Sequence, residues 1–157
     1  MLAHDQIICG THRMRHRVNA MIRHKLGFNG DTPAVGEKLL CLRNDKQLGL
    51  HNGTLWTVTK SGLPRRGFVE LEIEDDTQHR VAVEAPIDGF TSRDGSGAEL
   101  PGQPSAFGYC LTCHKAQGSQ WGSVLVIDES RWFRADRWRW LYTAITRAAD
   151  RVTVVQP

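Results

Sequence analysis

Side chains that suit phosphate chemistry gather in two short runs in the last third of the sequence. Residues 112–120 read Thr-Cys-His-Lys-Ala-Gln-Gly-Ser-Gln, and residues 141–148 read Leu-Tyr-Thr-Ala-Ile-Thr-Arg-Ala. Hydroxyl, imidazole and ammonium groups donate hydrogen bonds to phosphate oxygens, and an arginine can neutralise charge that develops during phosphoryl transfer. The two runs therefore predict a site that handles phosphate groups.

The expected local structure favours that use. Thr112 and His114 lie two residues apart at the end of an expected strand, so both should project to the same side. Arg147 follows Thr143 by one helical turn and lies off the apolar stripe of an expected helix, which leaves its side chain free to point into a cleft. A core histidine and a surface arginine near a helix C-terminus are the simpler interpretations of His114 and Arg147.

Two other patterns in the same region allow different chemistry. Residues 110–114, Cys-Leu-Thr-Cys-His, match the C-x-x-C-H pattern of covalent haem attachment. Residues 124–129 form an apolar run that ends in Asp-Glu, as the metal-binding strand of P-loop ATPases does. The first pattern falls within an apolar strand of a chain without an export signal, and the second follows the polar run instead of preceding it. We therefore interpret the cysteines as small strand residues and the two acids as exposed residues at a strand end.

Alternating strands and helices must position these runs. Residues 6–9, 106–112, 123–127 and 151–155 are short apolar runs of strand length. A helix is expected from the N-cap Thr11 to Gly27. Its apolar stripe comprises Met14, Val18, Met21, Ile22 and Leu26, and its expected solvated basic face holds Arg13, Arg17, Asn19 and Arg23.

A second helix is expected to begin near Asp136. Its expected apolar stripe comprises Trp138, Leu141, Tyr142, Ile145, Ala148 and Ala149. Strands that alternate with helices and are almost continuously apolar are typical of a parallel sheet covered by helices. The ends of the chain therefore predict an α/β fold.

The middle of the chain has the pattern of a small β module. Residues 38–42, 68–73 and 80–85 read as strands. Residues 48–58 read as a hairpin, because the sequence Asn52-Gly53 supplies the two positive φ angles of a type I′ turn. Four or five short strands over about 50 residues favour a small antiparallel barrel or meander. Residues 86–104, rich in Gly, Pro, Ser and Asp, are expected to form a long loop without a packing signal.

The composition is that of a globular protein with one core and room for one sub-domain. The 157 residues are 40% hydrophobic and 24% charged, and no stretch approaches the roughly 18 apolar residues of a membrane span. The first residues lack the basic and apolar regions of a signal peptide. We therefore expect a cytoplasmic protein whose four cysteines stay reduced. A net charge of +3 does not by itself indicate a nucleic-acid partner.

Residues 112–119 resemble motif V of the RecD-like and Dda-like helicases of superfamily 1, and residues 141–148 are similar to their motif VI. The hairpin at residues 52–54 resembles the barrel that these helicases insert in their second RecA-like domain. The resemblance covers nearly the whole chain in the family's order. It implies a RecA-like motor domain of residues 1–35 and 105–157, an inserted small β-barrel of residues 36–85, and a flexible loop of residues 86–104.

The resemblance implies the C-terminal motor domain of an ATP-dependent DNA helicase, of bacterial or phage origin, that moves 5′→3′ on single-stranded DNA. It assigns Arg147 as the catalytic arginine that acts on the γ-phosphate. The ATP-binding residues that it implies are Gln117, Gly118, Gln120 and Arg147. The DNA-binding residues that it implies are Thr112, His114, Lys115 and Asn52.

Two departures from the family pattern limit what this chain should do alone. Gln120 stands where the family usually has Glu, which puts in question any role that needs a negative charge. The sequence contains no Gly-x-x-x-x-Gly-Lys-Ser/Thr loop, so ATP and Mg²⁺ would be bound mainly by an N-terminal RecA-like domain that supplies the Walker motifs. We therefore expect one part of a larger motor, inactive by itself. The alternative is a stand-alone nucleic-acid-binding module without ATPase activity.

Overall fold

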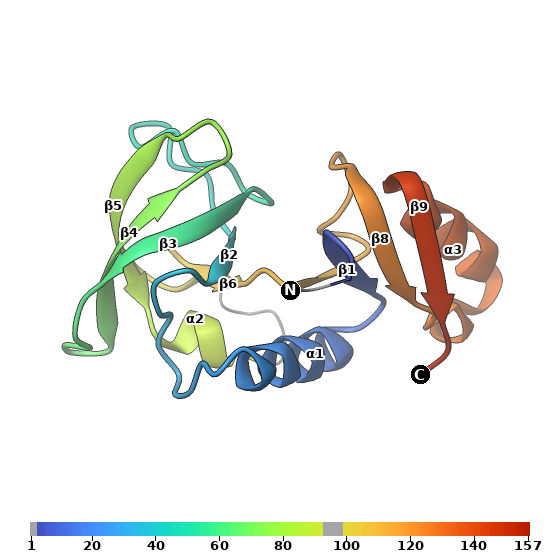
Figure 1. The fold of residues 1–157 in the computed structure, drawn as a ribbon, viewed down its shortest axis with the longest axis horizontal. Coiled ribbons are helices and arrows are strands. Elements are labelled where there is room, and N and C mark those ends of the chain that lie inside the picture. Colours follow the sequence, from blue (N-terminus) through green and yellow to red (C-terminus); the bar gives the residue numbers. More distant parts are fainter. Residues whose placement is uncertain (1–2, 93–98) are drawn as a thin grey trace. The chain divides into compact units, whose positions relative to one another are not determined.

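The computed structural model describes residues 3–92 and 99–157 and divides the chain into two compact units. Unit 1 comprises residues 1–20 and 109–157, and unit 2 comprises residues 21–108. The boundary falls inside helix α1 (His12–Lys25), whose residues up to Ala20 belong to unit 1 and whose residues from Met21 belong to unit 2. Figure 1 labels the elements of both units.

Unit 1 is built on a sheet of four parallel strands. They are β1 (Gln6–Cys9), β7 (Cys110–Thr112), β8 (Trp121–Ile127) and β9 (Ala148–Val155), in the order β7-β1-β8-β9. Ile8 pairs with Leu111 on one side and with Val126 on the other, and all three side chains are buried. The parallel sheet expected from the apolar runs is thus confirmed. Strands that are covered on both faces need apolar side chains on both, as β1 and β7 have, whereas β9 at the edge of the sheet is mostly exposed.

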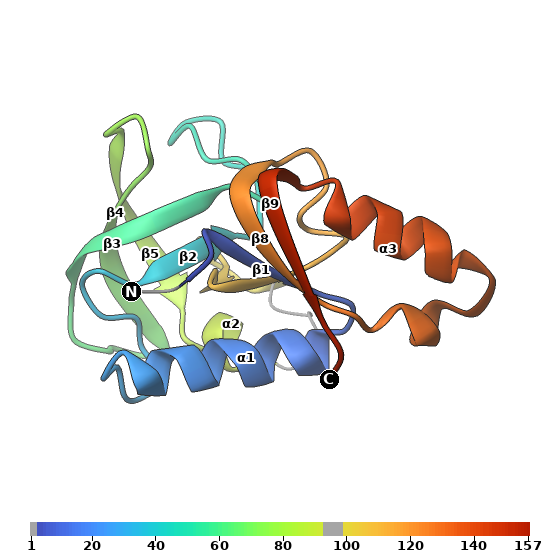
Figure 2. The same cartoon turned by 45° about the vertical axis from the view of Figure 1, so that its right-hand side comes forward.

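The core of unit 1 packs one face of α3 (Arg137–Ile145) against the sheet (Figure 2). Trp140 and Ala144 are buried in this core, whereas Trp138 and Tyr142 are about two-thirds exposed. The expected stripe was therefore right for Leu141 and Ile145, which pack against this core, and wrong for Trp138 and Tyr142. It also ran too far, since α3 ends at Ile145 and the alanines at 148 and 149 begin β9. A 3₁₀ segment, η2 (Ser130–Asp136), precedes α3, and its Phe133 stacks on Trp140 with ring centroids 5.2 Å apart.

Unit 2 is a curled antiparallel sheet of five strands. They are β2 (Lys38–Cys41), β3 (Leu55–Ser61), β4 (Phe68–Glu74), β5 (Arg80–Pro86) and β6 (Ser105–Phe107), in the order β5-β4-β3-β2-β6 (Figure 1). The alternation in β4 holds, with Val69, Leu71 and Ile73 buried. The two outer strands approach where the Gln103 N–H donates to the Glu84 carbonyl at 2.8 Å. This bond links β5 to the segment before β6, so the sheet curls towards the expected barrel.

The expected hairpin at residues 48–58 was wrong. Gly53 has a positive φ of 92° but Asn52 does not, and the turn is closed by the Thr54 N–H on the His51 carbonyl. Two positive φ angles in succession occur instead at Arg66 (53°) and Gly67 (83°), in the turn between β3 and β4. This pair has the φ signs of a type I′ turn, which matches the twist of two paired strands. Strand β3 thus pairs with β2 and β4, and not with residues 48–50.

Residues 86–104 contain more structure than their composition indicated. Strand β5 includes Pro86, and a short helix α2 (Asp88–Thr91) follows, with Phe90 buried against Phe107 at 5.2 Å between ring centroids. The absence of a packing signal was therefore misleading for this part. Residues 93–98 of the expected loop lie outside the described residues.

The strand expected at residues 106–112 is two strands in different sheets. Strand β6 pairs antiparallel with β2, while β7 pairs parallel with β1. Gly108 lies between them, and a Cβ atom there would approach the Leu55 side chain to 2.7 Å. Sequence alone gives no sign of this change of sheet, because both halves are apolar and buried.

Helix α1 begins and ends as expected but buries more polar groups. The Thr11 hydroxyl accepts the Met14 N–H as an N-cap, and Gly27, with φ of 85°, follows the last turn. Val18 and Ile22 are buried as expected, but Met21 is 61% exposed. Asn19 and Arg23, assigned to a solvated face, are buried, and that assignment was wrong.

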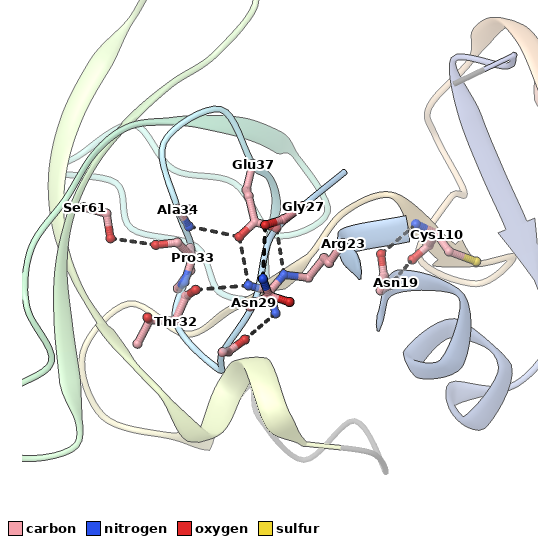
Figure 3. Close-up of polar contacts among 11 residues, drawn as sticks. Asn19, Arg23, Gly27, Asn29, Thr32, Pro33, Ala34, Glu37, Ser61 and Cys110 are labelled. Atoms are coloured by element: carbon pink, nitrogen blue, oxygen red, sulfur yellow. Dashed lines mark hydrogen bonds and ion pairs between the residues drawn. The ribbon is translucent and has the colours of Figure 1, made fainter. Parts of the chain in front are cut away.

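Asn19 and Arg23 each form hydrogen bonds with buried groups (Figure 3). The Asn19 side-chain amide exchanges two hydrogen bonds of 3.0 Å with the peptide groups of Cys110, on the edge of β7. Arg23 forms a bidentate pair with Glu37 at 2.7 and 3.0 Å, donates to the carbonyls of Gly30 and Thr32, and lies over a phenylalanine ring. Buried polar groups are tolerated because their hydrogen bonds are made inside the protein.

In residues 3–92 and 99–157, helices that combine the length and the apolar character needed to cross a membrane are absent.

Candidate functional site

The loop after β7 is a series of tight turns that presents the first polar run. The Ala116 N–H donates to the Thr112 carbonyl at 3.0 Å, and the Ser119 N–H donates to the Ala116 carbonyl at 3.2 Å. Gly118 has φ of 86°, a conformation that side chains disfavour, although its surroundings leave room for a Cβ atom. The loop is therefore defined by its backbone, and it begins at the carboxyl edge of the parallel sheet.

Thr112 and His114 do not project together. Strand β7 ends at Thr112, so strand alternation does not extend to His114, and the expectation of a shared side was wrong. Thr112 is 4% exposed, and its hydroxyl accepts the Lys115 N–H at 3.4 Å, whereas His114 is exposed. Thr112 thus shapes the loop from inside while His114 stands on its surface. Lys115 is partly buried.

A cavity of about 270 Å³ lies beside this loop, within unit 1. His114 and Gln117 line it from the loop, and Arg139 and Thr143 line it from α3. Imidazole, amide, guanidinium and hydroxyl groups therefore converge on one space, a donor set that suits phosphate or sugar oxygens. The other lining residues are Gly10, Cys113, Phe133, Asp136 and Trp140. The carboxylate among them makes the cavity mixed in charge.

Arg147 connects the two polar runs. It lies in the turn between α3 and β9, not in the helix, and it is partly buried. Its guanidinium donates to the Thr143 carbonyl at 3.1 Å, to the Ser119 carbonyl at 3.2 Å and to the Thr146 hydroxyl at 3.3 Å. The expectation of a side chain without local partners was wrong. Three of the five N–H donors of a guanidinium are engaged here, which fixes its direction.

The remaining expected site residues are not among those that line this cavity. Gln120 is exposed immediately before β8, and Gly118 forms the last turn of the loop. Asn52 lies in unit 2, where its N–H donates to the Asn44 side-chain oxygen at 2.7 Å. Sequence reasoning missed Arg139, which precedes Thr143 by one helical turn. A sequence analysis that identified the buried face of α3 correctly would have placed Arg139 and Thr143 together on the face that lines the cavity.

The acids at the end of β8 are not the exposed pair that was expected. Glu129 is 4% exposed, and its carboxylate accepts the Gly10 N–H at 2.8 Å and the Thr11 N–H at 2.9 Å. Backbone N–H groups at the start of α1 stabilise a carboxylate in this position. Asp128 accepts the Ser130 N–H at 2.9 Å, and its bonds to Ser130 are the main reason that its pKa is lowered. Both carboxylates therefore have internal partners.

The cysteines of the C-x-x-C-H pattern are core residues. Cys110 is fully buried and Cys113 is 3% exposed. Burial raises the pKa of Cys113 to about 11, and it raises the pKa of Cys110 above its ordinary value as well. Because thiolates are the reactive form, both thiols should react slowly while the chain is folded. We expect no covalent haem, so the purified chain should have the mass of its sequence, 17.6 kDa.

These raised pKa values predict that stability falls in alkaline solution. Unfolded thiols lose their protons near pH 9, whereas the folded Cys113 keeps its proton to about pH 11. The unfolded state then binds fewer protons, so the free energy of unfolding should fall on the order of 2 kcal/mol between those pH values. Urea titrations at several pH values give the slope of the unfolding free energy against pH, which should be steeper for the parent chain than for Cys113→Ala. Equal slopes, or rapid alkylation of the folded chain, would contradict this expectation.

Comparison with known proteins identifies relatives of both units. Residues 107–155 match the family model described as the UvrD-like helicase C-terminal domain. Over 120 residues, 74% of this chain, it is 47% identical to the ATP-dependent RecD2 DNA helicase of Deinococcus radiodurans. Over 156 residues, 99% of this chain, it is 28% identical to the RecBCD enzyme subunit RecD of Mycobacterium tuberculosis. The chain spans 13% of the first relative and 24% of the second.

Solved structures of Pif1 helicases share the fold. The Pif1 helicase from Candida albicans matches 96% of this chain and 44% of its own, with a TM-score of 0.64 and 16% identity. Bacteroides Pif1 bound to single-stranded DNA matches 96% of this chain and 40% of its own, with a TM-score of 0.56 and 18% identity. The arrangement of a parallel sheet with helices and an antiparallel sheet is thus that of a RecA-like helicase C-terminal region.

Proposed function

We propose that this chain, which belongs to the RecD-like helicases of superfamily 1 and includes a UvrD-like helicase C-terminal domain, acts as the second motor domain of an ATP-dependent DNA helicase. In this role it works with an N-terminal RecA-like domain that binds the triphosphate and Mg²⁺. Unit 1, residues 1–20 and 109–157, is the motor domain, and the insert lies within unit 2, residues 21–108, to which β6 belongs through its pairing with β2. Movement is 5′→3′ on single-stranded DNA.

The observation that carries this proposal is the hydrogen bond that joins the two polar runs beside the amino ends of β8 and β9. Arg147 donates to the Ser119 carbonyl, so the arginine is positioned by the loop that contains Gln117 and Gly118. In open α/β sheets, ligands bind outside the carboxyl ends of the strands, where this loop begins. The loop ends at Ser119 and Gln120, before the amino end of β8, and Arg147 precedes the amino end of β9. The loop therefore connects the edge where ligands bind to the arginine.

The roles of the site residues follow from the resemblance of the two polar runs and of the insert to the helicase motifs. Arg147 acts on the γ-phosphate, and Gln117, Gly118 and Gln120 contact the nucleotide. His114 and Lys115 contact DNA phosphates, and Asn52 contributes from the insert. Thr112, being buried, acts through the loop that it shapes and not through direct contact.

A second candidate function is a stand-alone nucleic-acid-binding module. Unit 2, an antiparallel sheet with its own buried residues, is the observation that favours this candidate, because the sheet could bind nucleic acid while unit 1 serves as a scaffold. The candidates differ in one respect. A motor domain must support ATP hydrolysis when a Walker-containing domain is joined to it, whereas a binding module need not.

A chimaera tests the proposal. The matching segment of the Deinococcus RecD2 helicase is replaced by this chain, whose 47% identity favours correct docking. The chimaera should hydrolyse ATP in response to single-stranded DNA and unwind a duplex with a 5′ tail, while the isolated chain should show no turnover above buffer. A matched chimaera in which residues 28–107, the part of unit 2 that follows α1, are replaced by a short Gly-Ser linker should keep some hydrolysis and lose unwinding.

Two results would reject the motor role. The first is a folded chimaera that binds DNA but hydrolyses ATP no faster than the RecD2 protein without its C-terminal segment. The second is ATP turnover by the isolated chain in a preparation free of contaminating ATPases.

A further inference from the structure

Two adjoining cavities open at the carboxyl edge of the parallel sheet, apart from the cavity beside His114. One, of about 290 Å³, is lined by Arg13 and Arg17 of α1 and by Trp132 of η2. The other, of about 230 Å³, is lined by Arg137. Both are lined by Arg131 and by Pro157. We call this double cavity, with its four arginines and Trp132, the arginine groove. All of its residues belong to unit 1.

The charge of the arginine groove is only partly compensated within the described part of the chain. The ion pairs of the described residues join Arg23 with Glu37, Lys60 with Glu72, and Arg80 with Glu74, and they include none of the four groove arginines. Asp128 and Glu129 also line the groove; both accept backbone N–H groups, and the charges of Arg137 and Arg131 contribute to the lowered pKa of Asp128. Four guanidinium groups against two carboxylates leave a net positive surface, which attracts anions.

The groove also presents an aromatic face. Trp132 is 64% exposed, although a tryptophan is usually buried, and the Arg131 guanidinium lies 5.4 Å from its ring centroid. Proteins that bind single-stranded nucleic acids combine cationic side chains along the sugar-phosphate backbone with exposed aromatic rings. The phosphates pair with the cations while a base stacks on the ring.

The shape favours a polyanion over a single compact phosphate group. Arg13 and Arg17 lie one turn apart on α1 and face the first cavity, while Arg137 lies in the second. The positive charge is thus spread along two hollows joined at Arg131. Successive phosphates of one strand could each meet a different arginine.

We propose that the arginine groove binds single-stranded nucleic acid, with Arg13, Arg17, Arg131 and Arg137 on the phosphates and a base stacked on Trp132. This inference rests on the proposed motor function and adds a nucleic-acid contact outside the two polar runs. The groove would hold the strand on the second motor domain during translocation.

Binding of a fluorescent oligothymidylate to the intact chain tests the groove. Trp132→Ala should weaken binding on the order of tenfold, and Trp132→Phe should restore most of it, since any aromatic ring can stack. Arg131→Ala should weaken binding and lower the salt dependence of log K by about 0.7, the share of one phosphate contact on a single strand. Thermal unfolding of each variant checks that the exposed side chain can be removed without loss of fold.

Matched controls come from the same segment. Tyr142 is an aromatic residue that is 67% exposed and is not among the residues that line the groove. Arg134 is likewise exposed and is not among them. Tyr142→Ala and Arg134→Ala should leave the affinity within about twofold of the parent, an effect typical of surface changes.

The outcomes separate this inference from the proposed function. Unchanged DNA affinity in Trp132→Ala and Arg131→Ala, with a chimaera that still hydrolyses ATP in response to DNA, would overturn the groove and leave the motor role intact. Competition by ATP alone at the same concentration as the oligothymidylate, abolished by Arg131→Ala, would make the groove a mononucleotide site and also overturn it. A chimaera without ATPase, together with the expected DNA-binding losses, would reject the motor role and support the groove.

Discussion

Replacing Arg147 by Ala in the RecD2 chimaera is expected to lower ATP turnover about a thousandfold, a barrier increase of ~4 kcal/mol. A guanidinium that acts on the γ-phosphate interacts most strongly with the charge of the transition state, so the maximal rate should fall far more than the affinity for ATP or DNA. Arg147→Lys should not restore the rate. A point charge cannot bridge Ser119, Thr143 and a phosphate as a planar fork can.

The contacts of Arg147 add a structural component to this result. Removing its side chain removes hydrogen bonds to two backbone carbonyls and a hydroxyl, so a modest loss of stability, roughly 1–3 kcal/mol, should accompany the kinetic defect. Arg151 is the matched control, since it is an exposed arginine that donates to the Ala3 carbonyl at 3.1 Å. Arg151→Ala should turn over ATP at the parental rate.

Steady-state kinetics with thermal unfolding of each chimaera measures both components. Two outcomes would sink the assignment of Arg147. One is a variant that unfolds at the assay temperature, which would make the arginine structural. The other is near-parental turnover with collapsed DNA affinity, which would place it with His114 and Lys115 among the DNA contacts.

Removing either partner of the buried Arg23–Glu37 pair is expected to cost the isolated chain about 3–5 kcal/mol of unfolding free energy. The side chain of Glu37 is fully buried and that of Arg23 is 9% exposed, so the remaining partner would stay charged without a counterion. Arg23 also holds the carbonyls of Gly30 and Thr32, which ties down the segment between α1 and β2. A typical domain has only about 5–15 kcal/mol in total, so this is a large share.

Urea unfolding of Arg23→Ala, Glu37→Ala and the double variant measures the effect. The unfolding free energy of the double variant should fall by much less than the sum of the losses in the two single variants, because no unpaired charge is left. Arg23→Lys, which keeps the charge but not the fork, should fold and lose an intermediate amount. The exposed pair Lys60–Glu72, at 2.8 Å, is the matched control, and Lys60→Ala should lose far less. Equal losses for the buried and the exposed pair would contradict the expectation.

Local sequence determined which elements form in unit 1 and where its motifs fall. The apolar runs at residues 6–9 and 123–127 are strands, Thr11 caps α1, and the first polar run follows a strand end. These features depend on neighbours within one turn or one strand, so composition and period are sufficient to read them. The resemblance of the two polar runs to helicase motifs led to the same family as the later comparisons.

Only the tertiary structure decided which polar groups are buried and which side chains meet. Asn19 and Arg23 read as a solvated face because their partners, Cys110 and Glu37, are distant in sequence or follow a turn. Burial of a polar side chain is favourable only when a specific partner is supplied, and helical period carries no information about that partner.

The same reason applies to Arg147 and to the arginine groove. The sequence indicated a helical arginine whose side chain points into a cleft. In the structure α3 ends at Ile145, and Arg147 donates to the Ser119 carbonyl. Arg17 and Arg131 are 114 positions apart in the sequence, and their charges add only because α1 and η2 meet at one edge of the sheet. Local propensity sets the elements, whereas the electrostatic field of a surface depends on distances that the fold alone creates.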